Sequence, residues 1–419
     1  MKRGEEHLFS IRIIGALLGL HAMLPFKGAA ADMAEFTRCI GPDGVGPVCQ
    51  LDSGTYQIQS TLLIGRSNIT LKGTVVDSRR ATILQRAPGF TDILMADQFS
   101  ITSTPILTSI TIRDFVFDGN RSQFPGDPNI IDLLITTTRS VLVANCDFID
   151  AADTSMELRQ GTSGAVINHA SFKNPKIVGI GGGPSTPGMN EAANIYPLCK
   201  DFAFPTNILI TNSSFEDAGA NAIFFHAKDV RITNSVFQHN HKDAPFNSSG
   251  GQIGLSICTD NAAVLNNIFK DGPTTPNGWW ADGIEVHGTN VTVVDNLVTN
   301  NAGNGILLHG VQHFFTANWD PTTGSIANNQ MGYYRFAGIA VYNHVGWRPT
   351  DFVVIDHAIS INGHDYGVEF TNETPDIPMN HITLTNNCLK NNVDGPVYLS
   401  GMGLDVLIKN NWTANCGPD

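Results

Sequence analysis

The sequence predicts an all-β solenoid of short parallel strands, in which each repeat adds one coil to a stack. Short segments with alternating apolar residues recur along most of the chain, and many of them carry an asparagine at a similar place. The composition agrees with this fold class. The 419 residues include 41 glycines and only 15% charged residues, so the chain is poor in helix formers and rich in turn residues.

The first segment of each repeat has an alternating apolar run, then a polar residue, then a further apolar residue. Most successive copies begin 22 to 32 residues apart, with a wider gap between residues 174 and 208. The copies are VLVANCDFID (141–150), AVINHASFKN (165–174), ILITNSSFED (208–217), VRITNSVFQH (230–239), AAVLNNIFKD (262–271), VTVVDNLVTN (291–300), FVVIDHAISI (352–361), HITLTNNCLK (381–390) and VLIKNNWTAN (406–415).

A second, shorter strand is expected after each of these segments. Gly, Asn and Asp separate the segments, as turns require. The second strands are SMELR (155–159), GIGGG (179–183), AIFFH (222–226), QIGLS (252–256), GIEVH (283–287), GILLH (305–309), GIAVY (338–342), GVEFT (367–371) and PVYLS (396–400).

The repeats predict stacked coils because one unit cannot bury its apolar face alone, whereas neighbouring units together bury a continuous core. A β-sandwich or a propeller would need antiparallel hairpins and more regular spacing. The asparagine column also favours stacking, since amides at one equivalent turn can bond to each other and to the backbone. Its members are Asn145, Asn212, Asn234, Asn266, Asn296, Asn386 and Asn410.

The first 31 residues are typical of a signal peptide. Lys2 and Arg3 form a basic start, residues 11–24 form an apolar stretch, and residues 29–31 offer small side chains for cleavage. We therefore expect residues 32–419 to form one exported domain, secreted or periplasmic, with an N-terminal cap on the stack. No later run reaches the ~18 apolar residues of a membrane span, so no membrane contact is expected.

The seven cysteines all follow this segment. Cys39 and Cys49 enclose the loop IGPDGVGPV, so a disulfide between them is expected in an oxidising compartment. The odd count leaves at least one thiol unpaired, and Cys146 lies in a strand-like segment where packing is expected. No Cys-x-x-Cys pair supports a zinc or redox site.

The charge balance argues against a nucleic-acid partner. The net charge is −13. Phosphate contacts need clusters of Lys and Arg, and the sequence shows none.

The segment DGIEVHG (282–288) carries the candidate site. Side chains alternate between the faces of a strand. Ile284 and Val286 match apolar residues in nearly every coil, so they are expected inside. Glu285 and His287 are then expected outside, in solvent, on a wall shared with the neighbouring coils.

The outward positions of neighbouring coils form two columns beside this segment. A run of His and Tyr beside a Glu is a candidate for function, and an ordinary solvated surface is the plain alternative. The small side chains of Gly254 and Ala340 leave room for a ligand on this wall. The candidate catalytic residues are Asp282, Glu285, His287, His226, His309 and Tyr342, and the candidate substrate-binding residues are Trp279, Trp280, Arg335, Arg348 and Glu369. Exposed Trp faces stack on sugar rings, although covering the coil edge is an alternative role for Trp279 and Trp280.

The repeat pattern resembles the right-handed parallel β-helix family of secreted carbohydrate-active proteins, which have the pectin lyase-like fold. The family includes pectinases, polysaccharide lyases and mannuronan C5-epimerases. The resemblance covers roughly residues 50–415. It implies a single-stranded right-handed parallel β-helix that acts on a polysaccharide. One scaffold carries many chemistries, so the reaction must be inferred from the site.

The DGIEVH segment resembles the Tyr-Gly-Phe-Asp-Pro-His motif of the mannuronan C5-epimerases. Gly283, Glu285 and His287 match the motif in kind, whereas Asp282 stands in the place of the family's Tyr. The resemblance implies proton abstraction from a uronan, in a lyase or an epimerase. Glu285 and His287 would share acid–base duty, and Tyr342 would handle the second proton.

The family also holds the uronate with Arg. No Arg lies in the central outward columns, and the nearest candidates are Arg335, Arg348 and Arg159.

Glycoside hydrolysis is the first alternative. ADGIEV resembles the Asn-Thr-Asp-Gly-Phe-Asp-Ile segment of polygalacturonases, with Asp282 on the family's catalytic Asp, but Gly303 and Asn304 replace its Asp-Asp pair. A hydrolase can instead pair Asp282 or Glu285 with a third carboxylate, and the acidic net charge favours it because a polyuronate would be repelled. The third carboxylates considered are Asp243, Asp260 and Glu369.

A polysaccharide-binding or adhesion protein without catalysis is the second alternative, because a solenoid face with flanking aromatic residues serves that role equally well. No cofactor is required by any of these functions. The histidines and Glu285 can ligate a cation, although ~4.8 Å between coils is long for two ligands of one ion. Calcium, common in the resembled family, is possible.

Overall fold

The computed structural model describes residues 33–97, 107–123, 130–183, 204–243, 251–255, 259–273, 281–309, 324–327, 330–332, 337–343, 353–356, 358–372, 378–403 and 405–413. The predicted signal peptide lies outside these residues and stays a prediction. No helix in the described part of the chain has the length and apolar character of a membrane span.

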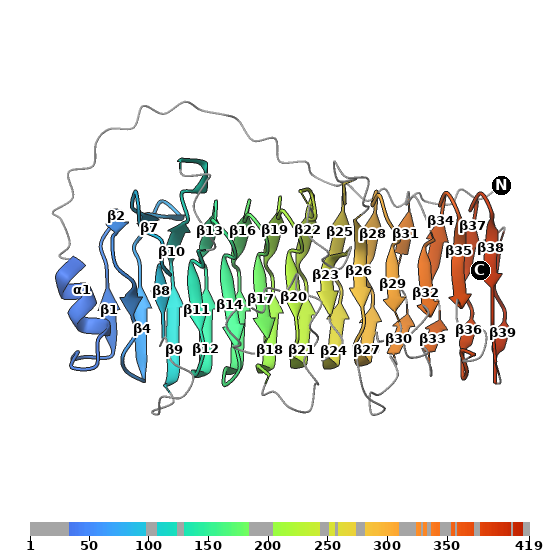
Figure 1. Ribbon diagram of the computed structural model, residues 1–419, viewed down its shortest axis with the longest axis horizontal. Coiled ribbons are helices and arrows are strands. Elements are labelled where there is room, and N and C mark those ends of the chain that lie inside the picture. The colour runs from blue at the N-terminus through green and yellow to red at the C-terminus, as the bar shows by residue number, and fades with distance from the viewer. Residues whose placement is uncertain are drawn as a thin grey trace, which may run out of the picture.

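Three parallel sheets run along one elongated stack, and each coil contributes one strand to each sheet (Figure 1). Sheet A holds β1 (Val48–Gln50), β4 (Ile69–Lys72), β9 (Thr108–Arg113), β12 (Arg139–Ala144), β15 (Ser163–Asn168), β18 (Thr206–Thr211), β21 (Lys228–Thr233), β24 (Asp260–Leu265), β27 (Thr289–Val294), β30 (Gly324–Ala327), β33 (Val353–Asp356), β36 (Thr383–Thr385) and β39 (Leu407–Lys409).

Sheet B follows sheet A within each coil. It holds β2 (Gly54–Ile58), β7 (Thr82–Arg86), β10 (Phe115–Asp118), β13 (Asp147–Ile149), β16 (Ser171–Lys173), β19 (Ser214–Glu216), β22 (Val236–Gln238), β25 (Ile268–Lys270), β28 (Leu297–Thr299), β31 (Gln330–Gly332), β34 (Ile359–Ile361) and β37 (Cys388–Lys390).

Sheet C completes each coil and carries the candidate site. It holds β3 (Leu62–Leu63), β8 (Met95–Ala96), β11 (Leu133–Ile135), β14 (Met156–Arg159), β17 (Ile180–Gly183), β20 (Ile223–Phe225), β23 (Gly251–Leu255), β26 (Asp282–Val286), β29 (Ile306–His309), β32 (Ile339–Asn343), β35 (Tyr366–Asn372) and β38 (Gly395–Leu399). The remaining elements are helix α1 (Met33–Ile40), the 3₁₀ turn η1 (Arg121–Gln123) and an antiparallel pair, β5 (Val75–Val76) with β6 (Arg79–Arg80).

The predicted stack of parallel strands is confirmed, and the structure adds two details. Eight of the nine first segments of the sequence repeat are two strands, one of sheet A and one of sheet B, so a complete coil has three strands; within the described residues, the last segment holds only β39. The repeat alignment, which began at residue 141, did not include the three coils that begin with β1, β4 and β9, and within its own range it missed the coil of β30 and β31, between residues 300 and 352. Their residues, GSIA and QMG, lack the alternating run of large apolar side chains that marked the other coils.

A ladder of phenylalanines fills the core behind sheet B. The rings of consecutive coils stack in parallel, with centroids 4.6 to 4.8 Å apart over the whole ladder. This spacing equals the separation of paired strands, so the rings follow directly from the register. The members are Phe117, Phe148, Phe172, Phe215, Phe237 and Phe269.

The turn between sheets A and B explains the asparagine column. Asparagine tolerates a positive φ better than most residues. Most of the predicted column has φ between 50° and 55° here, at Asn145, Asn212, Asn234, Asn266, Asn386 and Asn410.

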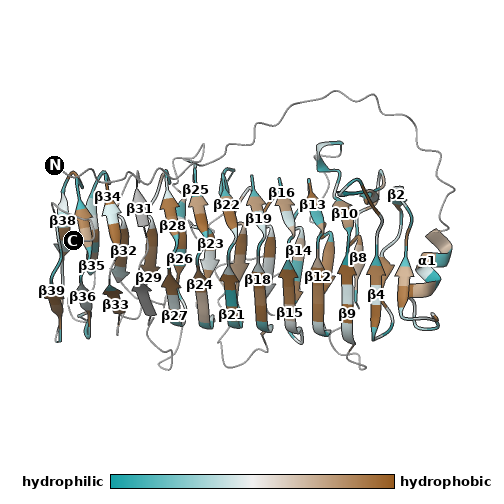
Figure 2. Cartoon of the chain, turned by 180° about the vertical axis from the view of Figure 1, so that it is seen from behind, coloured by the Kyte–Doolittle hydropathy of each residue, from teal (hydrophilic) through white to brown (hydrophobic). Residues whose placement is uncertain are grey.

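Figure 2 shows hydrophobic colouring along strands such as β12 and β15, with hydrophilic colouring at the strand ends.

Asn296 was wrongly assigned to this column. Asp295 holds the positive-φ position of that coil, and Asn296 is the next residue inward. Its Oδ1 accepts hydrogen bonds from the backbone and side chain of Asn267, both at 3.0 Å. A second amide ladder therefore runs inside the first, and it satisfies backbone groups that the buried turn would otherwise leave unpaired.

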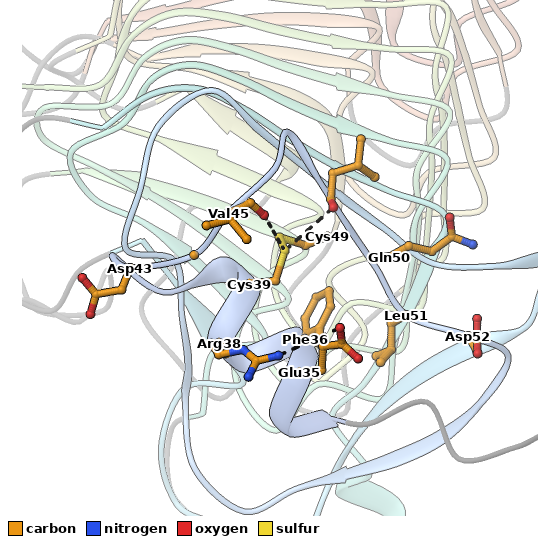
Figure 3. Close-up of a pocket in the computed structure, with 12 residues that line it drawn as sticks. Glu35, Phe36, Arg38, Cys39, Asp43, Val45, Cys49, Gln50, Leu51 and Asp52 are labelled. Atoms are coloured by element: carbon orange, nitrogen blue, oxygen red, sulfur yellow. Dashed lines mark hydrogen bonds and ion pairs between the residues drawn. A yellow bond between two sulfur atoms is a disulfide. The ribbon is translucent and has the colours of Figure 1, made fainter.

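Helix α1 covers the N-terminal end of the stack (Figure 1), where Phe36 and Ile40 are buried against the first coils. The predicted disulfide between Cys39 and Cys49 is confirmed and ties the end of this helix to β1. Beside it lies a cavity of about 550 Å³ whose lining includes Glu35, Arg38, Asp43 and Asp52 (Figure 3). Cys146, a free thiol, is buried, and burial raises its pKa to about 12.

Candidate functional site

Strand β26 places Glu285 and His287 on the outer side of sheet C. Ile284 and Val286 are fully buried in the main core, as the alternation predicts. The outward neighbours Leu307 and Ala340 belong to a separate apolar cluster against which Tyr342 packs. The predicted face of each residue is therefore right.

The predicted exposure of Glu285 and His287 to solvent is wrong. Glu285 is buried and His287 is half-buried. Phe224, Leu307 and Ala340, which share the outward column of Glu285, are buried as well. Alternation along a strand fixes the face to which a side chain points, but it does not fix how deeply that face is covered.

Glu285 and His287 form a close pair. His287 Nε2 lies 2.7 Å from Glu285 Oε1, and the side chains are 12% and 4% exposed respectively. The second carboxylate oxygen accepts a hydrogen bond from Gly251 N at 3.1 Å. Gly251 can have no side chain, because a Cβ there would lie 2.9 Å from the Glu285 Cβ. Gly251 of β23 therefore leaves space for the Glu285 side chain, and its backbone N donates to the carboxylate.

Two buried histidines flank this pair. Nδ1 of His226 and Nδ1 of His241 are buried without a hydrogen-bond partner. Burial lowers the pKa of His226 to about 4, helped by the nearby His287. Burial also lowers the pKa of His241 to about 4, against the opposing effect of Glu285. Both imidazoles are therefore neutral over the physiological pH range.

His241 is a site residue that sequence reasoning missed. It follows β22 by three residues, in the turn that leads to β23, and so belongs to neither outward column. Its φ of 73° is rare for a residue with a side chain. The available signal was a His in a turn where the preceding coil, 22 residues earlier, has Gly219.

Asp282 is held by the following coil. Its Oδ1 accepts hydrogen bonds from the backbone N and from Nδ2 of Asn304, the latter at 3.1 Å. Asn304 Oδ1 in turn accepts from Ala337 N at 3.1 Å, so the chain of contacts links three coils. Burial, then the nearby Glu285, raises the pKa of Asp282 well above its usual range.

Tyr342 lies two coils from His287 and belongs to a second cluster. Its hydroxyl donates to Glu369 Oε2 at 3.2 Å, and Thr371 donates to Glu369 Oε1 at 2.7 Å. Burial and the Glu369 carboxylate raise the pKa of Tyr342, so the phenol keeps its proton.

Glu369 cannot pair with Glu285 in hydrolysis. Three coils separate them in the register, which corresponds to roughly 14 Å. Two glycosidase carboxylates lie about 5 to 9.5 Å apart.

Arg159 does not reach the site. It forms a two-point ion pair with Glu157 of its own strand, at 2.7 and 3.0 Å, four coils before β26. Glu157–Arg159, Glu285–His287 and Glu369–Thr371 repeat one arrangement, in which an outward Glu accepts from the residue two places on.

Some candidates lie outside the described residues. They are Trp279, Trp280, Arg335 and Arg348, and the side chain of His309 is likewise not described. Among the described residues, no group of three His, Cys, Asp or Glu side chains is arranged to hold a metal ion. The expectation of no cofactor, with calcium as a possibility, stays an untested prediction.

Comparison with known proteins agrees with the geometry. The family model "Right handed beta helix region" matches residues 133–319. No curated protein sequence matches the chain.

Three solved structures share the architecture. The A-module of mannuronan C-5 epimerase AlgE6 from Azotobacter vinelandii is 14% identical with a TM-score of 0.57, and the alignment covers 88% of this chain and 91% of that chain. The catalytic unit of a GH87 α-1,3-glucanase from Streptomyces thermodiastaticus is 11% identical with a TM-score of 0.56, covering 93% and 68%. The Streptococcus pneumoniae surface protein and adhesin PfbA is 11% identical with a TM-score of 0.52, covering 91% and 94%. At these identities the likeness concerns the fold alone, and it is the same fold in each case. The chain therefore has the fold of a right-handed parallel β-helix.

Proposed function

We propose that this protein processes a polysaccharide outside the cytoplasm, by removing a proton from a uronate residue as lyases and C5-epimerases do. The observation that supports this most is the Glu285–His287 pair, with 2.7 Å between Nε2 and Oε1 on the outer side of sheet C. The fold is shared with a mannuronan C-5 epimerase, and the Cys39–Cys49 disulfide suits an oxidising compartment.

His287 is the base in this proposal and Glu285 is the residue that positions it. A carboxylate that accepts Nε2–H fixes the tautomer in which Nδ1 carries the lone pair. The same carboxylate stabilises the imidazolium that forms when the proton arrives. His287 is the more exposed of the two side chains, so it is the one that meets the substrate.

Tyr342 is the proton donor in this proposal. Its raised pKa keeps the hydroxyl protonated, which suits an acid rather than a base. Two coils, roughly 10 Å, separate the backbones of His287 and Tyr342, which leaves room for a sugar ring between the side chains. His309 lies between them in the register, beside Tyr342.

The uronate carboxylate needs a positive partner, and Arg159 is already paired with Glu157. Arg335 and Arg348 are the proposed partners, and Trp279 and Trp280 the proposed stacking residues. His226 and His241 lie beside the Glu285–His287 pair and are neutral, so they are polar but uncharged neighbours of it.

Glycoside hydrolysis remains the second candidate because the raised pKa of Asp282 favours a protonated carboxyl group, as a general acid requires. Asp282 and Glu285 would be the carboxylates. A binding role without catalysis is the third candidate, since the adhesin PfbA has the same fold.

A substrate panel separates the three candidates. The chain is incubated with polymannuronate, polyguluronate, polygalacturonate and an α-1,3-glucan. Unsaturated products absorbing in the ultraviolet indicate a lyase, inverted C5 signals in NMR an epimerase, and reducing ends without unsaturation a hydrolase. Retention of a polysaccharide without any product indicates a binder and contradicts the proposed reaction.

Two variants test the assignment of the site. We expect His287→Ala to lower the rate at least 100-fold, and Glu285→Gln to lower it less, because general base catalysis contributes about 10²- to 10⁴-fold. The matched control is His381→Ala, which removes a histidine from an exposed pair with Asp405, at 3.4 Å. Unchanged activity of His287→Ala would remove His287 from the mechanism.

A further inference from the structure

Two tyrosines of consecutive coils stack on the outer side of sheet C, near the C-terminal end of the solenoid. Tyr366 begins β35 and Tyr398 lies within β38. Their ring centroids are 5.0 Å apart with 27° between the ring planes. Tyr398 is 40% exposed, so the pair presents an aromatic surface to solvent.

The register explains why the Tyr398 ring lies on the outer face, and the ring stacking places Tyr366, at the start of its strand, beside it. Val397 and Leu399 pair with the buried Val368 and Phe370, so Tyr398 between them points away from the core. Tyr366 pairs with Gly395, which has a φ of 135° and no side chain. A Cβ built on Gly395 would lie in ordinary contact with the Tyr366 ring, at 3.8 Å, so it is the positive φ that favours glycine at this position.

Acidic side chains surround this pair. Burial, followed by the charges of Asp394, Glu369 and Asp365 together with Tyr398, raises the pKa of Tyr366. The Tyr366 hydroxyl therefore stays a hydrogen-bond donor, while the neighbouring carboxylates are acceptors. His364, a positively chargeable neighbour of this cluster, is exposed and lies 2.9 Å from Asp365.

We propose that the Tyr366–Tyr398 pair is a binding platform for the pyranose rings of a polysaccharide, separate from the Glu285–His287 site. The apolar C–H face of a sugar ring packs on an exposed aromatic ring, and its hydroxyl groups hydrogen-bond to polar groups at the edge. Asp365, Asp394 and Glu369 provide acceptors for those hydroxyls. They also repel carboxylates, so the platform prefers neutral pyranose residues over uronates.

The platform and the pair share one face of the solenoid. Glu285, Leu307, Ala340, Glu369 and Tyr398 are successive members of one outward column. Four coils separate Glu285 from Tyr398, roughly 19 Å along the axis. A single extended polysaccharide that carries both neutral and uronate residues can span that distance, so binding of its neutral residues at the platform would raise the local concentration of its uronates at the site.

Binding is measured on the full chain in its His287→Ala form, so that the result does not depend on the proposed reaction. The probes are a neutral α-1,3-glucan, a neutral mannan and polymannuronate, each cast into a native gel for affinity electrophoresis. We expect retardation by a neutral glycan, and a loss of affinity of about 2- to 10-fold in Tyr366→Ala and in Tyr398→Ala. Tyr398→Phe keeps the ring and should keep the affinity. Tyr56→Ala, a tyrosine of sheet B, is the matched control.

A second measurement needs no variant. Saturating neutral oligosaccharide should protect Tyr366 and Tyr398 from nitration in the wild-type chain, as read by peptide mass spectrometry, and should leave Tyr56 unprotected. The platform is overturned if both alanine variants bind every glycan as tightly as the His287→Ala form does. It is also overturned if no oligosaccharide changes the nitration of Tyr366 and Tyr398. Retardation by polymannuronate but by neither neutral glycan overturns its neutral preference. None of these results decides whether His287 is a base, which the product assays test separately.

Discussion

Two buried aspartates of the first coils differ in the hydrogen bonds that their carboxylates accept. Asp97 accepts four hydrogen bonds, from the backbone of Thr136 and Thr137 and from the hydroxyls of Thr136 and Thr138, at 2.7 to 2.9 Å. Asp132 is also fully buried, but neither of its carboxylate oxygens has a hydrogen-bond partner. Burial raises the pKa of Asp132 well above its usual range, with Asp118 adding to the effect.

The pH dependence of stability should follow from this contrast. A carboxyl group whose folded-state pKa is raised stays neutral in the folded chain while the unfolded chain ionises above about pH 4, so folding loses stability as pH rises. Asp132→Asn removes that loss. We expect the melting temperature of this variant minus that of wild type to become larger as the pH rises from 4 to 8.

Asp97→Asn is the matched control for this prediction. It places an amide donor against backbone and hydroxyl donors, and we expect it to cost about 1 to 3 kcal/mol at both pH values. Thermal unfolding followed by circular dichroism at the two pH values measures both variants. A constant difference between Asp132→Asn and wild type across this range would show that Asp132 does not stay protonated in the folded chain.

The residues of the site show where sequence reasoning stops. The face of Glu285 could be predicted because the apolar residues on either side of it recur in most coils. Its burial could not, because coverage depends on which segments lie over the face and not on the strand itself. His241 escaped notice because it comes from a turn, where no periodicity marks the direction of a side chain. Its closeness to Glu285 arises only when the coils are stacked in register.

At the scale of elements, the phenylalanine ladder is the most regular part of the core. Six rings stack at 4.6 to 4.8 Å, and the same column continues through Val298 and Leu389, with the buried Ser360 between them. A ring in the middle of the ladder packs against two others, so its removal leaves a cavity bounded by both neighbours.

Truncating a central ring should therefore be costly. We expect Phe215→Ala, which removes the contacts with both Phe172 and Phe237, to lower the free energy of unfolding by about 3 to 5 kcal/mol. Phe215→Leu fills much of the same space and should cost less. Urea unfolding followed by far-ultraviolet circular dichroism gives both values. A cost for Phe215→Ala no larger than for Phe215→Leu would mean that the neighbouring rings close the cavity.

The elements themselves were predictable to the extent that their side chains repeat. Every second strand of the sequence repeat became a strand of sheet C, and most of them are marked by Ile or Val followed by an apolar residue two places on. The coil of β30 and β31 was not predictable in this way, because Gly324, Ser325 and Gly332 carry no apolar pattern. Register with the coils on either side, which the sequence does not display, gives these residues their strands.

At the scale of the whole molecule, the two ends of the stack differ. The N-terminal end is covered by helix α1, whose Phe36 ring packs edge-on against Phe115 at 6.1 Å, and the disulfide holds that helix in place. At the C-terminal end, Leu399 of β38 aligns with the buried Phe370 and Ile408 of β39 aligns with the buried Leu384, yet both Leu399 and Ile408 are exposed. These last strands thus have core residues at core positions without the coverage that a core normally has.

This asymmetry predicts the order in which the solenoid opens. In a linear stack each coil is stabilised mainly by its two neighbours, so a coil that is packed on one side only has the smaller free energy of opening. We expect the amide hydrogens of β38 and β39 to exchange at least 10-fold faster than those of β12 and β15, which lie between covered coils. Native-state hydrogen exchange followed by mass spectrometry of peptic peptides makes this comparison within one sample. The strands β1 and β4, at the end capped by α1, are the internal control and should exchange more slowly than β39. Equal protection of β39 and β12 would show that Leu399 and Ile408 are covered in solution. Fast exchange of β1 would show that α1 does not stabilise the end that it covers.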